Sequence, residues 1–143
     1  MNLGCVKLLL IALAIFIVPN ILWAKDKVNS EATEAVRSTA AKAQLQANTG
    51  VVSIYVKGMC CESCAIGVRK KISKLKFVDK ERFKNGVDID AKTQLALVAL
   101  RQGQSPNIAA LAKAVDDAGF DPVNLYRLNK GRLQTTPLVI PAK

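Results

Sequence analysis

The hydrophobic and polar positions between residues 51 and 75 change from a period of two to a helical period. In residues 51–57 apolar and polar side chains alternate, with Val52, Ile54 and Val56 on one face. This alternation predicts a half-buried strand. A helix is predicted next, because the following apolar positions share one helical face and the basic residues lie outside it. These positions are Cys61, Ala65, Val68, Ile72 and Leu75.

The pattern from residue 87 onwards predicts two strands, a helix and a final strand. Residues 87–89 and 95–100 are apolar segments joined by a turn in which Asp90 can bond its own downstream backbone. A helix should follow, with Ser105 as its N-cap and Gly119 at its left-handed exit. Its expected buried positions are Ile108, Leu111, Val115 and Ala118. Residues 120–128 predict a last short strand, which Pro122 confines to an edge or to its first residues.

This order predicts an α+β fold of the ferredoxin-like βαββαβ type, an antiparallel sheet with two helices on one face. Residues 51–128 are long enough for one modest core. The charged segment 76–86 has no clear period and ends at Gly86.

The segments on either side of this domain have different patterns. Residues 1–24 combine a lysine, an apolar run, a Pro-Asn break and a terminal alanine, as in a cleaved secretory signal peptide. An uncleaved anchor is the alternative, at the short limit for spanning a bilayer. Residues 25–50 are alanine-rich and predict a spacer with a marginal helix at 31–46, begun by Ser30. Residues 129–143 contain two prolines and no period, so we expect a disordered basic tail.

The chain is strongly basic, with a formal charge of +10, or +9 once Lys7 is removed with the signal. Part of the excess lies on the first predicted helix, at Arg69, Lys70, Lys71 and Lys74. This stripe is either a solvated face or a docking surface for an acidic partner. An export signal and the lack of paired stacking aromatics on the predicted central strands argue against nucleic acid as a partner.

Three thiols lie within five positions at the predicted corner between the first strand and the first helix, at Cys60, Cys61 and Cys64. Such a local cluster cannot staple a fold, so it favours a ligand site. Two thiolates suit Cu(I) or Hg(II), and a third sulfur from Cys60 would suit Cd(II), Pb(II) or trigonal Cu(I). A closed zinc site needs four ligands, and the chain has no histidine to complete one.

The sequence Gly58-Met59-Cys60-Cys61-Glu62-Ser63-Cys64, with its flanking strand and helix, resembles the heavy-metal-associated domain family. Ala118-Gly119-Phe120 is similar to that family's exit from the second helix. The resemblance implies that Cys61 and Cys64 are the metal ligands, that Met59 is a buried residue shaping the loop, and that Phe120 packs beneath the site. The chain departs from the family at Cys60 and in the length of segment 76–86.

The family includes copper chaperones, domains of metal-pumping ATPases and periplasmic mercury-binding proteins, and export makes the last group the nearest likeness. The resemblance implies a monomeric, non-enzymatic carrier in the periplasm or cell envelope, anchored there if the signal is uncleaved. Its cargo would be Hg(II) or Cu(I), with Cd(II), Pb(II) or Zn(II) as alternatives, passed by thiolate exchange to a membrane metal transporter or metal-pumping ATPase. The alternatives are a thiol–disulfide redox protein using the same cysteine pair and an adaptor that docks a membrane partner.

Overall fold

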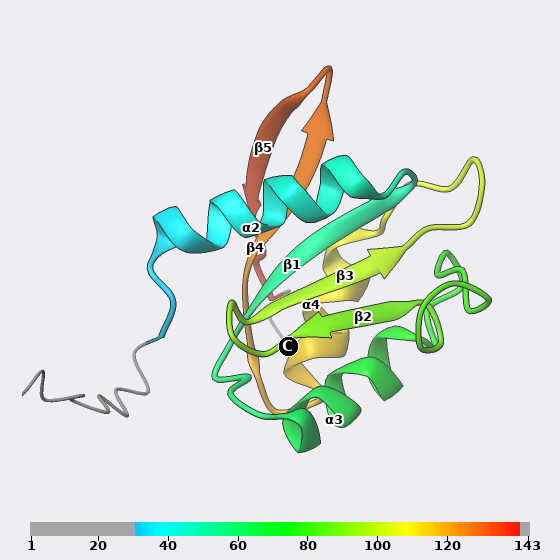
Figure 1. The fold of residues 1–143 in the computed structure, drawn as a ribbon. Helices are drawn as coiled ribbons and strands as arrows, with labels where there is room; N and C mark the ends of the chain where they lie inside the picture. The colour runs from blue at the N-terminus through cyan, green and yellow to red at the C-terminus, as the bar shows by residue number, and fades with distance from the viewer. Residues whose placement is uncertain (1–30, 141–143) are drawn as a thin grey trace, which may run out of the picture.

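The computed structural model describes residues 31–140, which form a five-stranded antiparallel sheet with helices on both faces (Figure 1). The strand order across the sheet is β2-β3-β1-β4-β5. From β1 to β4 the chain follows the βαββαβ order, so the predicted ferredoxin-like topology is confirmed. The elements are α2 (Glu34–Ala47), β1 (Val51–Lys57), α3 (Glu62–Ile72), β2 (Val87–Asp90), β3 (Leu95–Ala99), α4 (Ile108–Asp116), β4 (Asp121–Asn129) and β5 (Arg132–Pro137).

The main core lies between one face of the sheet and the helices α3 and α4, as the periodicity predicts. Val52, Ile54 and Val56 of β1 are buried there, together with apolar positions of both helices. From α3 the buried residues are Ala65, Val68 and Ile72, and from α4 they include Leu111 and Val115. The predicted turn is also present, because Asp90 Oδ1 accepts the Lys92 N–H at 3.0 Å.

The start of α4 differs from its prediction. Asn107, not Ser105, is the N-cap, and its side-chain oxygen accepts the Ala110 N–H at 3.0 Å. Both residue types are good caps, so local propensity could not choose between them. The exit is as predicted: Gly119 has a φ of +86°, which a residue without Cβ adopts readily.

Helix α2 covers the outer face of the sheet (Figure 1), which corrects the prediction of a spacer that buries little surface. It begins after Thr33, whose hydroxyl caps the Val36 N–H, and not after Ser30. Its Ala41 and Leu45 are buried against apolar and aromatic side chains of three strands, Tyr55, Leu95, Leu97 and Tyr126. The strand β1 is therefore buried on both faces and not half-buried.

Polar side chains also attach α2 to the sheet, beside its small apolar face. Arg37 is buried, and its guanidinium carbon lies 3.4 Å from the ring centroid of Tyr55. The guanidinium donates to the Ala32 and Thr93 carbonyl oxygens at 2.6 and 3.3 Å. It also forms an ion pair with Glu34 at 3.0 Å, and Glu34 in turn accepts the Tyr126 hydroxyl at 2.8 Å.

The segment after β4 also differs from its prediction. Residues expected to belong to a disordered tail form β5, which pairs with β4 from Arg132 opposite Asn129 to Pro137 opposite Asn124. Lys130 and Gly131, both with positive φ, make the two-residue hairpin turn. This strand was not predicted because five of the six residues of β5 are polar or proline, so the segment has no apolar pattern.

The charged segment between α3 and β2 is ordered and tied to the core. Val78 is buried and forms an isolated bridge with Leu100, and the Asp79 N–H donates to the Ala99 carbonyl at 3.0 Å. Gly86 closes the segment with a φ of +83°. A Cβ at Gly86 would lie only 2.4 Å from Val78 Cγ1 and 2.6 Å from the Asp79 carbonyl oxygen. Only glycine therefore fits this backbone path.

The predicted signal peptide, residues 1–24, lies outside the described residues. Among residues 31–140, no helix combines the length and the hydropathy that a membrane span requires.

We expect Arg37→Ala to lower the free energy of unfolding by about 1–3 kcal/mol, because it removes several part-buried hydrogen bonds made by a buried side chain of α2. The matched control is Lys42→Ala, an exposed position of the same helix, which should change stability by less than about 0.5 kcal/mol. Urea unfolding followed by circular dichroism measures both. Equal effects of the two variants would contradict a stabilising role for the Arg37 contacts.

The two tyrosines of the chain both lie under α2, so their ionisation reports on its docking. Burial, together with hydrogen bonds to Glu31 and Glu34, raises the pKa of Tyr55 and of Tyr126 to about 12. Folding favours the neutral form of both tyrosines. Their contribution to the free energy of unfolding is therefore complete below pH 10 and is lost as the pH rises towards 12. Ultraviolet titration should find both pKa values near 12 in the native chain and near 10 in urea; native values near 10 would show that α2 is undocked.

Candidate metal centre

The cysteines lie where β1 ends and α3 begins, and the backbone of this corner sets their positions. Gly58 turns the chain out of β1 with a φ of +85°. Met59 is fully buried in the main core and anchors the loop to it. Cys61 is the N-cap of α3, in extended conformation, and Cys64 lies in the first helical turn. Side chains at an N-cap and three residues later converge, which brings these two sulfurs together.

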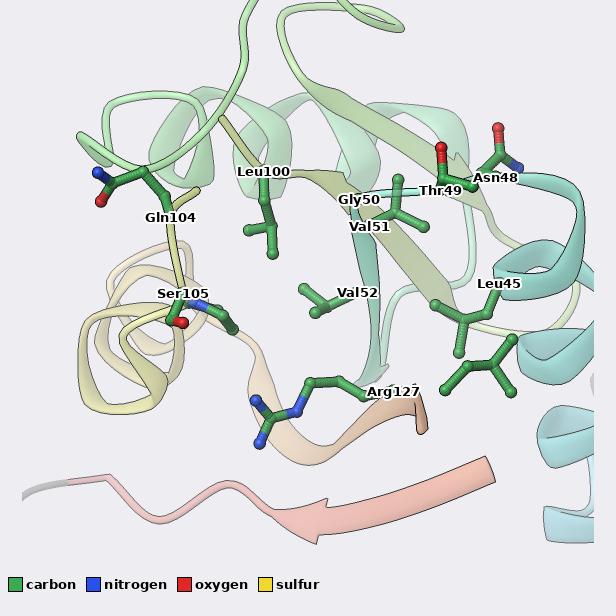
Figure 2. A pocket seen from close by; sticks show the side chains of 12 residues that line it. Leu45, Asn48, Thr49, Gly50, Val51, Val52, Leu100, Gln104, Ser105 and Arg127 are labelled. Carbon is green, nitrogen blue, oxygen red and sulfur yellow. The ribbon is translucent and has the colours of Figure 1, made fainter. Parts of the chain in front are cut away.

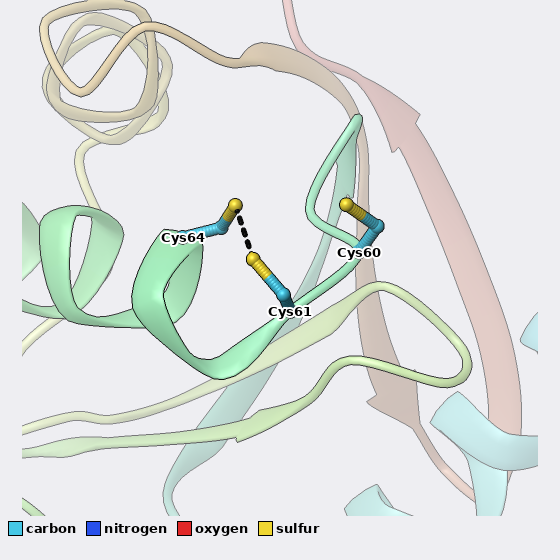
Figure 3. Close-up of side chains that lie close together, drawn as sticks. All are labelled: Cys60, Cys61 and Cys64. Carbon is cyan, nitrogen blue, oxygen red and sulfur yellow. Dashed lines mark hydrogen bonds between the residues drawn. The ribbon is translucent and has the colours of Figure 1, made fainter.

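The three sulfurs form one cluster at the surface. Cys61 Sγ and Cys64 Sγ are 2.8 Å apart, and both thiols are free. All three sulfurs, including that of Cys60, lie within 4.8 Å of one another. Figure 3 shows Cys61 and Cys64 facing each other, with Cys60 on the neighbouring loop. Cys60 is exposed and the other two are half-buried, so the cluster is open to an incoming ion.

The pair differs in acidity because one sulfur receives hydrogen bonds that stabilise its thiolate. The Cys64 thiol and, secondarily, the Ser63 hydroxyl 3.1 Å away lower the pKa of Cys61 to about 7. The hydrogen bond with Cys61 raises the pKa of Cys64, because the protonated Cys64 thiol can donate to the Cys61 sulfur. One thiolate is therefore available near neutral pH, as both nucleophilic attack and metal binding require. Sequence reasoning missed Ser63, whose place inside the Cys-x-x-Cys motif was the available signal.

The residues expected to support the loop lie beside it. Phe120 is half-buried against the main core, where it follows the exit of α4. A Cβ at Gly58 would lie 3.7 Å from Phe120 Cδ1, so this ring is in contact range of the loop backbone. The structure thus places Gly58 and Met59 in the cysteine loop and Phe120 against the backbone of that loop.

The basic stripe expected on the first helix is divided by the structure. Arg69 donates its Nε–H to the Val87 carbonyl at 3.2 Å, which fixes this side chain against β2. Lys70 is exposed and Lys71 is half-exposed, both on α3. The helix ends at Ile72, so Lys74 lies in the turn beyond it.

A separate hollow lies at the far end of β1, between the end of α2 and the loop that leads into α4 (Figure 2). It is lined by Val51 and Val52, at the start of the strand whose other end carries the cysteines. Arg127 reaches across it. A seven-residue strand is about 23 Å long, so this hollow is distinct from the thiol cluster.

The chain is similar in sequence to known proteins over a region that contains the cysteine loop. A model of the heavy-metal-associated domain matches residues 53–121, which contain the cysteine loop and Phe120. The periplasmic component of the mercuric transport protein of Pseudomonas fluorescens is 35% identical over 86 residues, 60% of this chain and 87% of that protein. The corresponding protein of an Alcaligenes species is 34% identical over the same shares. The crystal structure of oxidized MerP from Ralstonia metallidurans CH34 has 35% identity and a TM-score of 0.41, covering 50% of this chain and 90% of that one.

We expect Cys61 to be alkylated faster than Cys64 at pH 7–8, because the pKa of Cys61 is lowered to about 7 while that of Cys64 is raised. The rate for Cys61 should rise with pH and level off above about 8, as its thiolate fraction saturates. Iodoacetamide labelling with tandem mass spectrometry measures each site. In Cys64→Ala the largest cause of the lowered pKa is gone, so the Cys61 profile should move to higher pH; an unchanged profile would contradict this explanation.

Proposed function

The chain belongs to the heavy-metal-associated domain family, and on this premise we propose that it is a periplasmic carrier of a soft metal ion, Hg(II) first and Cu(I) second. The observation that carries the proposal is the cluster of three sulfurs within 4.8 Å at an open corner of the fold. Thiolates prefer soft ions, and we propose that the chain binds such an ion without catalysing a reaction. Mercury is favoured over copper because the relatives named above are mercuric transport proteins.

Cys61 and Cys64 are the proposed primary ligands. Their sulfurs are 2.8 Å apart, whereas two sulfurs on opposite sides of one ion, each at about 2.3 Å, are separated by about 4.6 Å. Binding therefore requires the pair to open by about 2 Å. The outward position of Cys61, at the start of α3 and without a side-chain cap bond, allows this movement while Cys64 stays on the helix.

Cys60 is the proposed third sulfur, used during exchange or by ions that prefer three ligands. It is exposed and already within 4.8 Å of both other sulfurs. A third sulfur would favour Cd(II), Pb(II) or trigonal Cu(I) over linear Hg(II). Zn(II) is the weakest candidate, because no fourth protein ligand joins the cluster among the described residues.

Delivery to a membrane metal transporter or metal-pumping ATPase completes the proposal. A site with two or three sulfurs leaves room for an acceptor thiolate to bind the same ion. Each new metal–sulfur bond from the acceptor then replaces one from the carrier, whose sulfur leaves as a thiolate, so no oxidant or reductant is needed. The export signal expected in residues 1–24 and the periplasmic relatives support this location. The chain would act as a monomer, with Arg69 and Lys70 of the expected basic stripe facing the acceptor.

A thiol–disulfide redox function is the alternative, since the close pair and the lowered pKa of Cys61 also suit disulfide exchange. In a metal carrier, oxidation of Cys61 and Cys64 to a disulfide would prevent metal binding. In a redox protein, the same oxidation would be one step of the catalytic cycle.

The reduced full chain should bind one Hg(II) through sulfur, with an affinity far above that for Zn(II), as ligand softness requires. Anaerobic competition titration against a thiol chelator measures the affinity. Cys61→Ser and Cys64→Ser should each weaken Hg(II) binding at least about 100-fold, since either leaves a single primary thiolate. Similar affinities for Hg(II), Zn(II) and Mg(II) would contradict the proposal, and rapid catalysis of disulfide exchange without metal would favour the redox alternative.

Cys60→Ser tests the third sulfur and serves as the matched control for the two ligand variants. Hg(II) affinity should fall less than about 10-fold, because linear coordination is kept. The sulfur count seen by X-ray absorption with Cd(II) should fall by one. An unchanged Cd(II) spectrum would exclude Cys60 as a ligand.

A further inference from the structure

A groove runs along α3, between this helix and the charged segment that precedes β2, and nothing assigned so far explains it. Its volume is about 650 Å³, within the range of pockets that hold ligands. The helix contributes residues from Ile66 to Ser73, and the opposite wall runs from Lys80 to Asn85. The groove begins two residues after Cys64, which is about 3 Å of helix rise beyond that cysteine.

The groove carries positive charge from both walls. Arg69 and Lys70 line it from the helix, and Lys80 and Lys84 line it from the segment, with no carboxylate among the lining residues. Within residues 31–140 the ion pairs are Arg37 with Glu34 and Lys113 with Asp117, so none of these four cations is neutralised by a carboxylate within 4.0 Å. Four uncompensated cations facing one hollow favour an anionic occupant.

The same groove has exposed apolar side chains on both walls. Ile66 is 61% exposed on the helix and Phe83 is 38% exposed on the segment. They are two of the few large apolar residues that the described chain leaves exposed, and both lie among the cations. A free anion such as phosphate would leave these apolar surfaces in water, whereas a peptide with acidic and apolar side chains would cover both.

Contacts to the rest of the fold hold the backbone of both groove walls in place, so the groove exists without a partner. Arg69 is fixed by its hydrogen bond to the Val87 carbonyl. Arg82 holds the segment by donating to the Thr49 carbonyl at 2.8 Å and lies over the ring of Phe83. The glycine requirement at Gly86 and the bridge between Val78 and Leu100 fix the base of the segment. A preformed groove lowers the entropic cost of binding.

We propose that this groove binds an acidic segment of the metal acceptor, with an apolar side chain of that segment lying between Ile66 and Phe83. The inference rests on the proposed function, because docking at this place would hold the acceptor beside the cysteines. A concave site between a helix and a loop suits a single peptide strand better than the flat surface of an anionic membrane. Of the expected docking stripe, only Arg69 and Lys70 line this groove, while Lys71 and Lys74 do not.

A fluorescein-labelled peptide of Glu-Glu-Leu repeats is the probe, titrated into the reduced full chain at low salt and followed by anisotropy. Lys70→Glu with Lys84→Glu should weaken binding at least about 10-fold, since two attractive contacts become repulsive. The matched control is Lys71→Glu with Lys74→Glu, which makes the same change in net charge outside the groove and should weaken binding less than about 3-fold. Equal losses in the two double variants would overturn the groove as a specific site and leave only general attraction.

Two further arms test the apolar contact and the class of partner. Ile66→Ser should weaken binding of the Glu-Glu-Leu peptide but not of a Glu-Glu-Ser peptide, and equal effects on both would overturn the apolar part of the proposal. Vesicles of equal parts phosphatidylcholine and phosphatidylglycerol are the rival probe. Stronger groove-dependent binding to vesicles than to the peptide would overturn a protein acceptor in favour of a membrane surface.

Hg(II) affinity, measured on the same variants, separates the two proposals. It should be unchanged in both charge-reversed variants, because none of the altered residues contacts a sulfur. If the parent chain binds the peptide in the groove but does not bind Hg(II), the carrier function fails while the docking site stands. If it binds Hg(II) but not the peptide, the groove proposal fails alone.

Discussion

The position of β1 is the constraint on which the rest of the structure depends. This strand is central in the sheet, paired with β3 on one side and β4 on the other, and it is buried on both faces. It therefore cannot shift in register without breaking two ladders and exposing two apolar clusters. The cysteine loop follows directly from its end, and Met59 continues its burial into the loop. An open thiol site is thus attached to a central strand that is buried on both faces.

The fold between β1 and β4 was predictable because its signals are local. Alternation in β1 and helical spacing in α3 directly report which side of each element is buried, and the cysteines lie close together in sequence. The docking of α2 was not predictable in the same way. Its anchor is Arg37, a residue type that sequence patterns assign to solvent, and its hydrogen-bond partners Thr93 and Gln94 are 56 and 57 positions away. The burial of a charged side chain such as Arg37 can be recognised only when the three-dimensional positions of its distant partners are known.

The clustering of the cysteines was predictable, but the finer chemistry of the site was not. The spacing of Cys61 and Cys64 indicated a shared ion, whereas the difference in their acidity depends on the orientation of two thiols and of Ser63. The hairpin of β4 and β5 was missed because its turn, Lys130-Gly131, joins a strand to a polar partner with no alternation. The groove could not be predicted from the sequence for a similar reason. Its second wall, residues 80–85, shows neither a helical nor a strand period.

Gly86 is a residue from which the presence of the groove can be recognised in a sequence alone. Any side chain there would collide with Val78 and with the backbone of Asp79, so the path of the preceding segment is possible only with this residue. A related chain of similar length between its first helix and second strand can keep the same second wall only if it keeps this glycine. A relative with another residue at that position must route the segment differently, even when its cysteine motif is identical. The cysteine motif and the groove can therefore be inherited separately.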